Sequence, residues 1–204
     1  MKNTENTIIN HDIGRAVTGY MVNAIFDHAS KQIIADVQDA LGKEFGDSIW
    51  LTPIDSLHIT LLDWIAPLVD YGEDKSKLFR DHFDQYDAAL QTSLLDIKPI
   101  FLQFDTVKAT PGAVIIAASD NTVLDSIRQH TIDQVTLLEG TKQPPKITHS
   151  TIARYNKSFP LEQIICFLED YSINFTYNVD HFRLIREDIA PQLQYEVLKE
   201  YPIL

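Results

Sequence analysis

The same order of predicted elements occurs twice along the chain. Residues 17–26 are rich in β-branched and aromatic residues and predict a strand, which is followed by apolar residues at helical spacing. A second strand is predicted at 57–65, and a further helix and a strand at 96–107 complete this first copy. This alternation of strands and helices predicts an α+β fold.

The second copy repeats the order of the first. Its predicted elements are, in turn, a strand at 113–117, a helix over 123–135, a strand at 147–155, a helix over 158–168 and one long strand at 174–186. A last strand at 193–199 would close the fold.

No linker separates the two copies, which span about 17–107 and 112–186. We therefore predict a single domain over 15–204, built of two pseudo-symmetric lobes with a cleft between them. Each lobe would be a mostly antiparallel sheet with helices on its outer side.

Composition and charge narrow the class of protein. The 204 residues are 45% hydrophobic, which is enough for a sizeable core, and the net charge of −12 argues against a protein that grips long nucleic acid. The single cysteine, Cys166, has apolar neighbours and predicts a buried thiol in a reducing compartment. Residues 1–14 are polar and predict a flexible arm without an apolar leader, and no apolar run is long enough to span a membrane. We expect a cytoplasmic monomer without a membrane partner.

The third element of each copy carries the same short motif. Leu57-His58-Ile59-Thr60-Leu61 lies in the first copy and Thr148-His149-Ser150-Thr151-Ile152 in the second, and the two histidines are 91 residues apart, close to the length of one copy. Residues i and i+2 of a strand point to the same face, so each motif presents an imidazole beside a hydroxyl. If the lobes face each other, both pairs meet in one cleft.

Two such pairs suit a phosphodiester. One neutral imidazole can take a proton from a nucleophile while the other, as imidazolium, gives a proton to the leaving oxygen. The threonine hydroxyls can bond the non-bridging oxygens as charge develops on them. This arrangement requires no metal and no other cofactor, and the sequence leaves open which histidine is the base.

The two motifs resemble those of the two-histidine (2H) phosphoesterase superfamily, which includes bacterial RNA 2′–5′ ligases and 2′,3′-cyclic phosphodiesterases. Its hallmark is a pair of His-x-Thr/Ser motifs on strands of two pseudo-symmetric lobes. The stretch from His149 to Arg154 resembles the second motif, which in the ligase-like branch often continues into a Leu-Ala-Arg-like stretch. The resemblance implies a bilobal fold, metal-independent phosphodiester chemistry and a catalytic tetrad of His58, Thr60, His149 and Thr151.

Strand alternation sorts the further candidates for substrate binding. Trp64 shares the predicted face of His58 and could wall the cleft, and Tyr155 shares that of His149 and could stack on a base, although packing in the core is the commoner role for both. Arg154 falls on the opposite face unless the strand has a bulge or ends first, in which case it could reach a phosphate. The first strand adds two candidate lining residues, Tyr20 and Asn23.

These observations predict a phosphodiesterase that hydrolyses 2′,3′-cyclic phosphates or similar small nucleotide phosphodiesters. The acidic chain favours a nucleotide or a short oligonucleotide over long RNA as the partner. Two alternatives stay open: RNA 2′–5′ ligation, which runs the same chemistry in reverse, and a nucleotide-binding sensor or scaffold without turnover.

Overall fold

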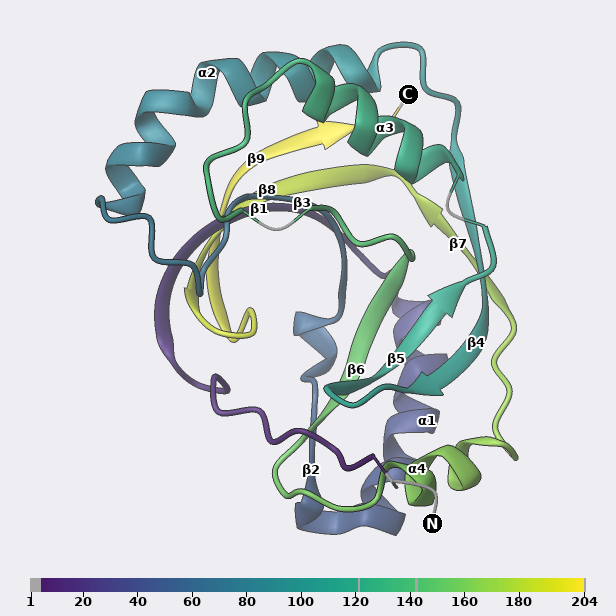
Figure 1. Ribbon diagram of the computed structural model, residues 1–204. Coiled ribbons are helices and arrows are strands. Elements are labelled where there is room, and N and C mark those ends of the chain that lie inside the picture. Colours follow the sequence, from purple (N-terminus) through teal and green to yellow (C-terminus); the bar gives the residue numbers. More distant parts are fainter. Residues whose placement is uncertain (1–4, 121, 142, 204) are drawn as a thin grey trace.

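The computed structural model describes residues 5–120, 122–141 and 143–203. Its strands form two sheets in which neighbouring strands run antiparallel, and helices pack against both (Figure 1). The predicted α+β fold of two lobes is therefore confirmed. No helix in the described part of the chain is both long and apolar enough to cross a membrane.

The two sheets differ in size. The smaller has the order β3-β1-β8-β9 and consists of β1 (Ala16–Ile25), β3 (His58–Ile65), β8 (His181–Ile189) and β9 (Gln194–Pro202). The larger has the order β2-β6-β5-β4-β7 and consists of β2 (Ile49–Leu51), β4 (Ile100–Ala109), β5 (Ala113–Ala118), β6 (His149–Tyr155) and β7 (Phe175–Val179).

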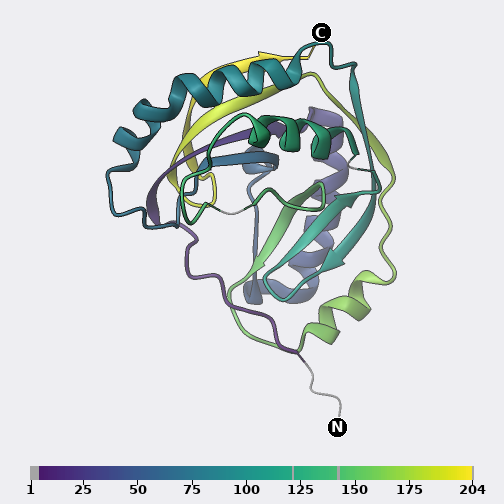
Figure 2. The same ribbon diagram turned by 45° about the horizontal axis from the view of Figure 1, so that its top comes forward.

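Four α-helices cover the sheets: α1 (His28–Phe45), α2 (Lys75–Leu94), α3 (Thr122–Asp133) and α4 (Leu161–Leu168). Figures 1 and 2 show α2 and α3 over the four-stranded sheet and α1 along the five-stranded one. The two longest helices begin at aspartates, because the side chains of Asp27 and Asp74 accept hydrogen bonds from backbone amides of the first turn. One continuous hydrophobic cluster fills the space between the sheets and the helices.

Each sheet takes strands from both halves of the chain. β4 belongs to the first half but pairs with β5, and β8 belongs to the second half but pairs with β1. The helices cross over as well: α1 follows β1 yet contacts β6, and α3 follows β5 yet contacts β3. The two lobes are interlocked in this way, and the strands that carry the two motifs, β3 and β6, lie next to each other.

Two expectations about the later strands need correction. The single strand expected at 174–186 is two strands, β7 and β8, which lie in different sheets on either side of Asp180. β7 buries alternate residues and β8 buries residues 182–185 in succession, so buried apolar positions continue across the break and give no sign of the change of sheet. The three-residue strand β2, too short for a periodicity signal, was not expected.

The N-terminal segment and Cys166 also differ from expectation. Residues 5–10 do not form a loose arm, since backbone hydrogen bonds tie Thr7 to Phe159 and Asn10 to Tyr155. Their polar composition hid this, because main-chain groups make the contacts. Cys166 lies exposed on α4, whose buried face is made of Leu161, Ile164 and Leu168.

Candidate active site

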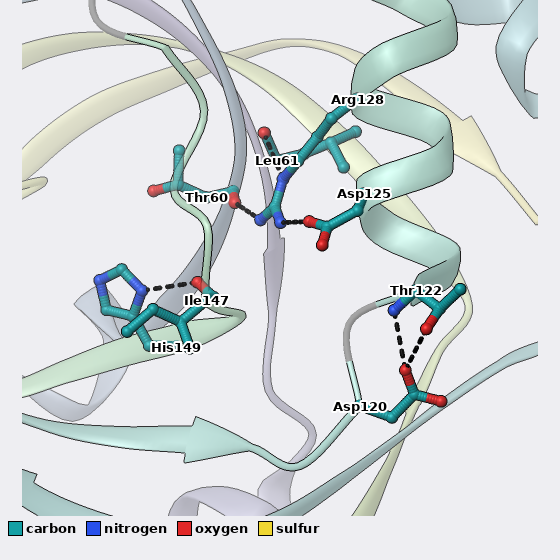
Figure 3. A network of polar contacts seen from close by, with 8 residues as sticks. All are labelled: Thr60, Leu61, Asp120, Thr122, Asp125, Arg128, Ile147 and His149. Carbon is teal, nitrogen blue, oxygen red and sulfur yellow. Dashed lines mark hydrogen bonds and ion pairs between the residues drawn. The ribbon is translucent and has the colours of Figure 1, made fainter.

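The two motif histidines are held in the same way. Nδ1 of His58 lies 2.7 Å from the carbonyl oxygen of Ser56. Nδ1 of His149 lies 3.0 Å from the carbonyl oxygen of Ile147, as Figure 3 shows for this second pair. A carbonyl oxygen can only accept, so each Nδ1 carries the proton and donates it. When such a ring is neutral, its Nε2 carries the lone pair and can take part in proton transfer.

A pocket of about 200 Å³ brings several candidate residues together. His58, Thr60 and Arg154 all line it, between β3, the C-terminal end of β6 and the turn that joins β8 to β9. His149 and Thr151 are half-buried on β6 and are not among its lining residues. His149 is nevertheless near enough that its charge lowers the pKa of His58. Further polar lining comes from Asn10, Asp12, Asp63, Glu187 and Gln192.

The environment of His58 favours the neutral imidazole. Burial is the main reason that its pKa falls from 6.5 to about 4. The positive charges of Arg154, Arg183 and His149 lower the pKa too, while the hydrogen bond to the Ser56 carbonyl opposes them. At neutral pH the ring is therefore uncharged and has an available lone pair.

A β-bulge in β3 changes which side chains face the pocket. The ladder with β1 skips Leu61, so β3 carries one extra residue after Thr60, and the ladder is irregular a second time where it skips Trp64. Asp63 consequently lines the pocket, and Trp64 turns into the core, where it is 2% exposed. Its ring packs among Phe79, Phe83 and Tyr86. The expectation that Trp64 walls the cleft was wrong because simple alternation does not hold through the bulge.

β6 has a bulge at the matching place. Its ladder with β5 skips Ile152, the residue after Thr151, and Arg154 therefore lines the pocket rather than facing away from it. The same shift buries Tyr155, which is 0% exposed and donates from its hydroxyl to the carbonyl of Thr110 at 2.9 Å. Tyr155 thus cannot stack on a base, contrary to expectation.

Tyr20 also lies away from the pocket. It is 4% exposed, stacks on Phe79 with ring centroids 3.9 Å apart, and donates to the Ser76 hydroxyl at 3.1 Å. These contacts fasten β1 to α2, so the expectation that Tyr20 lines the cleft was wrong.

Arg154 brings an incompletely bonded cation to the pocket. Its Nε atom is buried and has no hydrogen-bond partner among the described residues. Burial lowers the pKa of this guanidinium, while the charges of Glu187 and Asp12 raise it. A buried donor of this kind is costly unless a ligand accepts from it, and a planar guanidinium matches phosphate oxygens well.

Sequence reasoning missed Gln192, which supports the pocket from the β8–β9 turn. Its carbonyl accepts from the Ser56 hydroxyl at 2.9 Å, its side-chain oxygen accepts from the Asn23 amide at 2.9 Å, and its backbone amide donates to Glu187 at 2.5 Å. The carbonyl that orients His58 therefore belongs to a residue fixed by a turn 136 positions away. Nothing in the sequence pattern pointed to this contact.

A metal centre finds no support in the described residues. No three side chains of His, Cys, Asp or Glu are grouped there as a metal ion would need. The carboxylates around the pocket instead act on each other, and burial together with the charge of Asp63 raises the pKa of Glu187.

Comparison with known proteins identifies the class of fold. No protein-family model matches the sequence, and no curated protein matches it. Among solved structures, TT0787 of Thermus thermophilus aligns with a TM-score of 0.64 at 14% identity, covering 91% of this chain and 97% of its own. E. coli LigT complexed with 3′-AMP aligns with a TM-score of 0.57 at 14% identity, covering 92% and 98%. A structure described as a phosphoesterase gives 0.58 at 15% identity, covering 91% and 98%.

The alignments extend over nearly the whole chain rather than one lobe. The chain therefore shares the fold of LigT and of the phosphoesterase over nearly its whole length, as the resemblance seen in the two motifs led us to expect.

Proposed function

We propose that the protein is a metal-independent phosphodiesterase that opens 2′,3′-cyclic phosphates, or similar small nucleotide phosphodiesters, with water. The observation that carries the proposal is the matched pair of histidines, His58 and His149, each with Nδ1 on a backbone carbonyl two residues before it in the sequence. Binding alone would not need two proton-transfer groups held in equivalent ways.

His58 is the general base in this proposal, because its lowered pKa keeps it neutral. It takes a proton from water as the water oxygen bonds to phosphorus. The bond from phosphorus to one ribose oxygen breaks, and His149, as imidazolium, gives that oxygen its proton. Thr60 and Thr151 donate to the non-bridging oxygens, and the Arg154 guanidinium offsets their growing charge.

The comparisons support a nucleotide as the substrate class. E. coli LigT has been solved with 3′-AMP, NADP+ and ATP. A 3′-monophosphate is the kind of product that opening a 2′,3′-cyclic phosphate leaves. The carboxylates of Asp12, Asp63 and Glu187 around the pocket, on a chain of net charge −12, favour a ligand with few phosphates.

The test offers 2′,3′-cyclic nucleotides to the wild type, His58→Ala and His149→Ala with a chelator present. We expect chelator-independent turnover with a bell-shaped pH profile, reduced by about 10²- to 10⁴-fold in each variant. His130→Ala, which changes an exposed histidine on α3, is the matched control and should keep wild-type rates. Phosphorus NMR of the product shows which ribose oxygen is the leaving group.

Two outcomes would contradict the proposal. Activity that survives both His58→Ala and His149→Ala would exclude the acid–base pair. Tight binding of nucleotides without turnover across a panel of phosphodiesters would instead assign a sensor.

A further inference from the structure

The bulge in the first motif strand is held by an arginine from the helix of the other half. Arg128 on α3 donates from Nε to the carbonyl of Leu61 at 3.0 Å and from Nη2 to the carbonyl of Thr60 at 2.8 Å (Figure 3). Its Nη1 bonds Asp125 at 2.9 Å, and only 3% of its side chain is exposed. Because β3 is an edge strand, these carbonyls have no neighbouring strand on that side to bond them.

The bulge in the second motif strand is held by a glutamine in the same manner. Gln38 on α1 is 4% exposed, and its Nε2 donates to the carbonyl of Ile152 at 2.7 Å and to that of Thr52 at 2.7 Å. The backbone amide of Thr52 donates to the same Ile152 carbonyl at 3.0 Å. The extra residue of each bulge thus offers its carbonyl to a buried side chain from a helix.

The two contacts are reciprocal. Gln38 lies 20 residues before His58 but holds the strand of His149, and Arg128 lies 21 residues before His149 but holds the strand of His58. Both contacts join parts of the chain that are far apart in sequence, 114 residues for Gln38 with Ile152 and 67 for Arg128 with Leu61. Each half of the chain therefore supplies the support for the other half's motif.

We propose that Arg128 and Gln38 are positioning residues: their hydrogen bonds to backbone carbonyls hold the two bulges in place and so keep the pocket side chains directed toward one site. The proposal rests on the proposed function. Without the bulge in β6, alternation would turn Arg154 out of the pocket and Tyr155 toward it. Without the bulge in β3, Asp63 and Trp64 would exchange places in the same way. Neither Arg128 nor Gln38 lines the pocket, so both act through the backbone.

The first experiment measures the bulges directly, without reference to activity. Arg128→Met and Gln38→Met keep an unbranched side chain but remove the donors, and Tyr201→Phe, which loses a hydroxyl that donates to Asp87, is a control for the loss of one hydrogen bond elsewhere. Amide hydrogen exchange by NMR should accelerate about tenfold at 60–63 in Arg128→Met and at 151–154 in Gln38→Met. Arg128→Lys, which can still donate to one carbonyl, should recover part of the protection.

Two results of the exchange experiment are incompatible with this proposal. Acceleration of equal size over both bulges in every variant, or protection unchanged at the bulge that lost its donor, would overturn the proposal. Because Gln38→Met replaces a neutral side chain, it keeps the test available if Arg128→Met fails to fold.

The second experiment tests whether the hydrogen bond from Gln38 to the bulge in β6 orients Arg154 into the pocket. In a double-mutant cycle with a 2′,3′-cyclic nucleotide, Gln38→Met should raise KM about tenfold, and adding Arg154→Ala should raise it little more, because the two changes remove the same contact. Arg128→Met and Arg154→Ala should instead multiply their effects, because they act on different strands. Multiplied effects in the Gln38 cycle would overturn the proposal.

A failure of the proposed function can be told apart from a failure of this positioning proposal. If the wild type turns over no phosphodiester, the same cycle is run on the dissociation constant of inorganic phosphate, and the exchange pattern still decides whether the bulges are locked.

Discussion

Acid should destabilise this protein in part through the burial of His58. The pKa of His58 is about 4 in the folded protein and 6.5 in an unfolded chain, so the unfolded state binds the proton more readily between these values. The neutral ring's contribution to stability is complete above pH 6.5 and is lost as the pH falls toward 4. At about 1.4 kcal/mol per pH unit, the 2.5-unit difference is worth about 3 kcal/mol in total and about 2 kcal/mol between pH 7 and 5.

The matched variant is His58→Asn, whose amide can still donate toward the Ser56 carbonyl but does not titrate. We expect urea unfolding at pH 7, 6 and 5 to show that the wild type loses about 2 kcal/mol more free energy of unfolding than His58→Asn. The two proteins share their other titrating groups, so the difference between their changes in unfolding free energy with pH isolates His58. Glu187 is one of these shared groups, and its raised pKa makes the folded state more stable, not less, as the pH falls. Equal slopes for the two proteins, or an imidazole that titrates near 6.5 by NMR, would refute the reasoning.

Four further outcomes follow from the geometry of the pocket. Thr60→Val and Thr151→Val should each lower kcat by about 10²-fold or more with little change in KM, measured by steady-state kinetics, because in the proposed mechanism their hydroxyls bond the charge that develops in the transition state. Arg154→Ala should raise the dissociation constant for inorganic phosphate by at least about tenfold, measured by calorimetry, and an unchanged constant would exclude a phosphate contact. Tyr155→Phe should leave KM unchanged and lower the free energy of unfolding by about 1 kcal/mol, measured in urea, since it removes only a buried hydrogen bond. Raising the salt concentration should increase kcat/KM for an anionic substrate, because it screens the net charge of −12.

The order of elements was largely predictable from the sequence. Apolar spacing located the helices and most strands, since each element buries one face of its own. The assignment of strands to sheets was not predictable in the same way. β7 and β8 follow each other with one residue between them, yet they lie in different sheets, and only contacts with distant strands decide that.

The candidate site, too, was predictable from the sequence only in part. The His-x-Thr spacing placed His58 beside Thr60 and His149 beside Thr151, because strand alternation holds over two residues. It gave the wrong side for Trp64 and Tyr155, each four residues after its motif threonine, because one extra residue inverts the alternation. Neither bulge has a glycine or a proline to mark it. The side chains that hold the bulges, Arg128 and Gln38, come from far along the chain.

The charged groups near His58 and the net charge of the whole chain act on different parts of a ligand. Arg154 and Arg183 lie near enough to His58 to lower its pKa, so a single phosphate group bound beside His58 would lie near two guanidinium groups. Beyond about 8 Å, the screening length at physiological salt, the acidic surface of the chain acts on whatever else the ligand carries. Each further phosphate of a long RNA would meet that acidic surface, which does not replace the counterions bound to the RNA. We infer that the positive charge is enough for one phosphodiester group and that the acidic surroundings limit how many more the ligand can have.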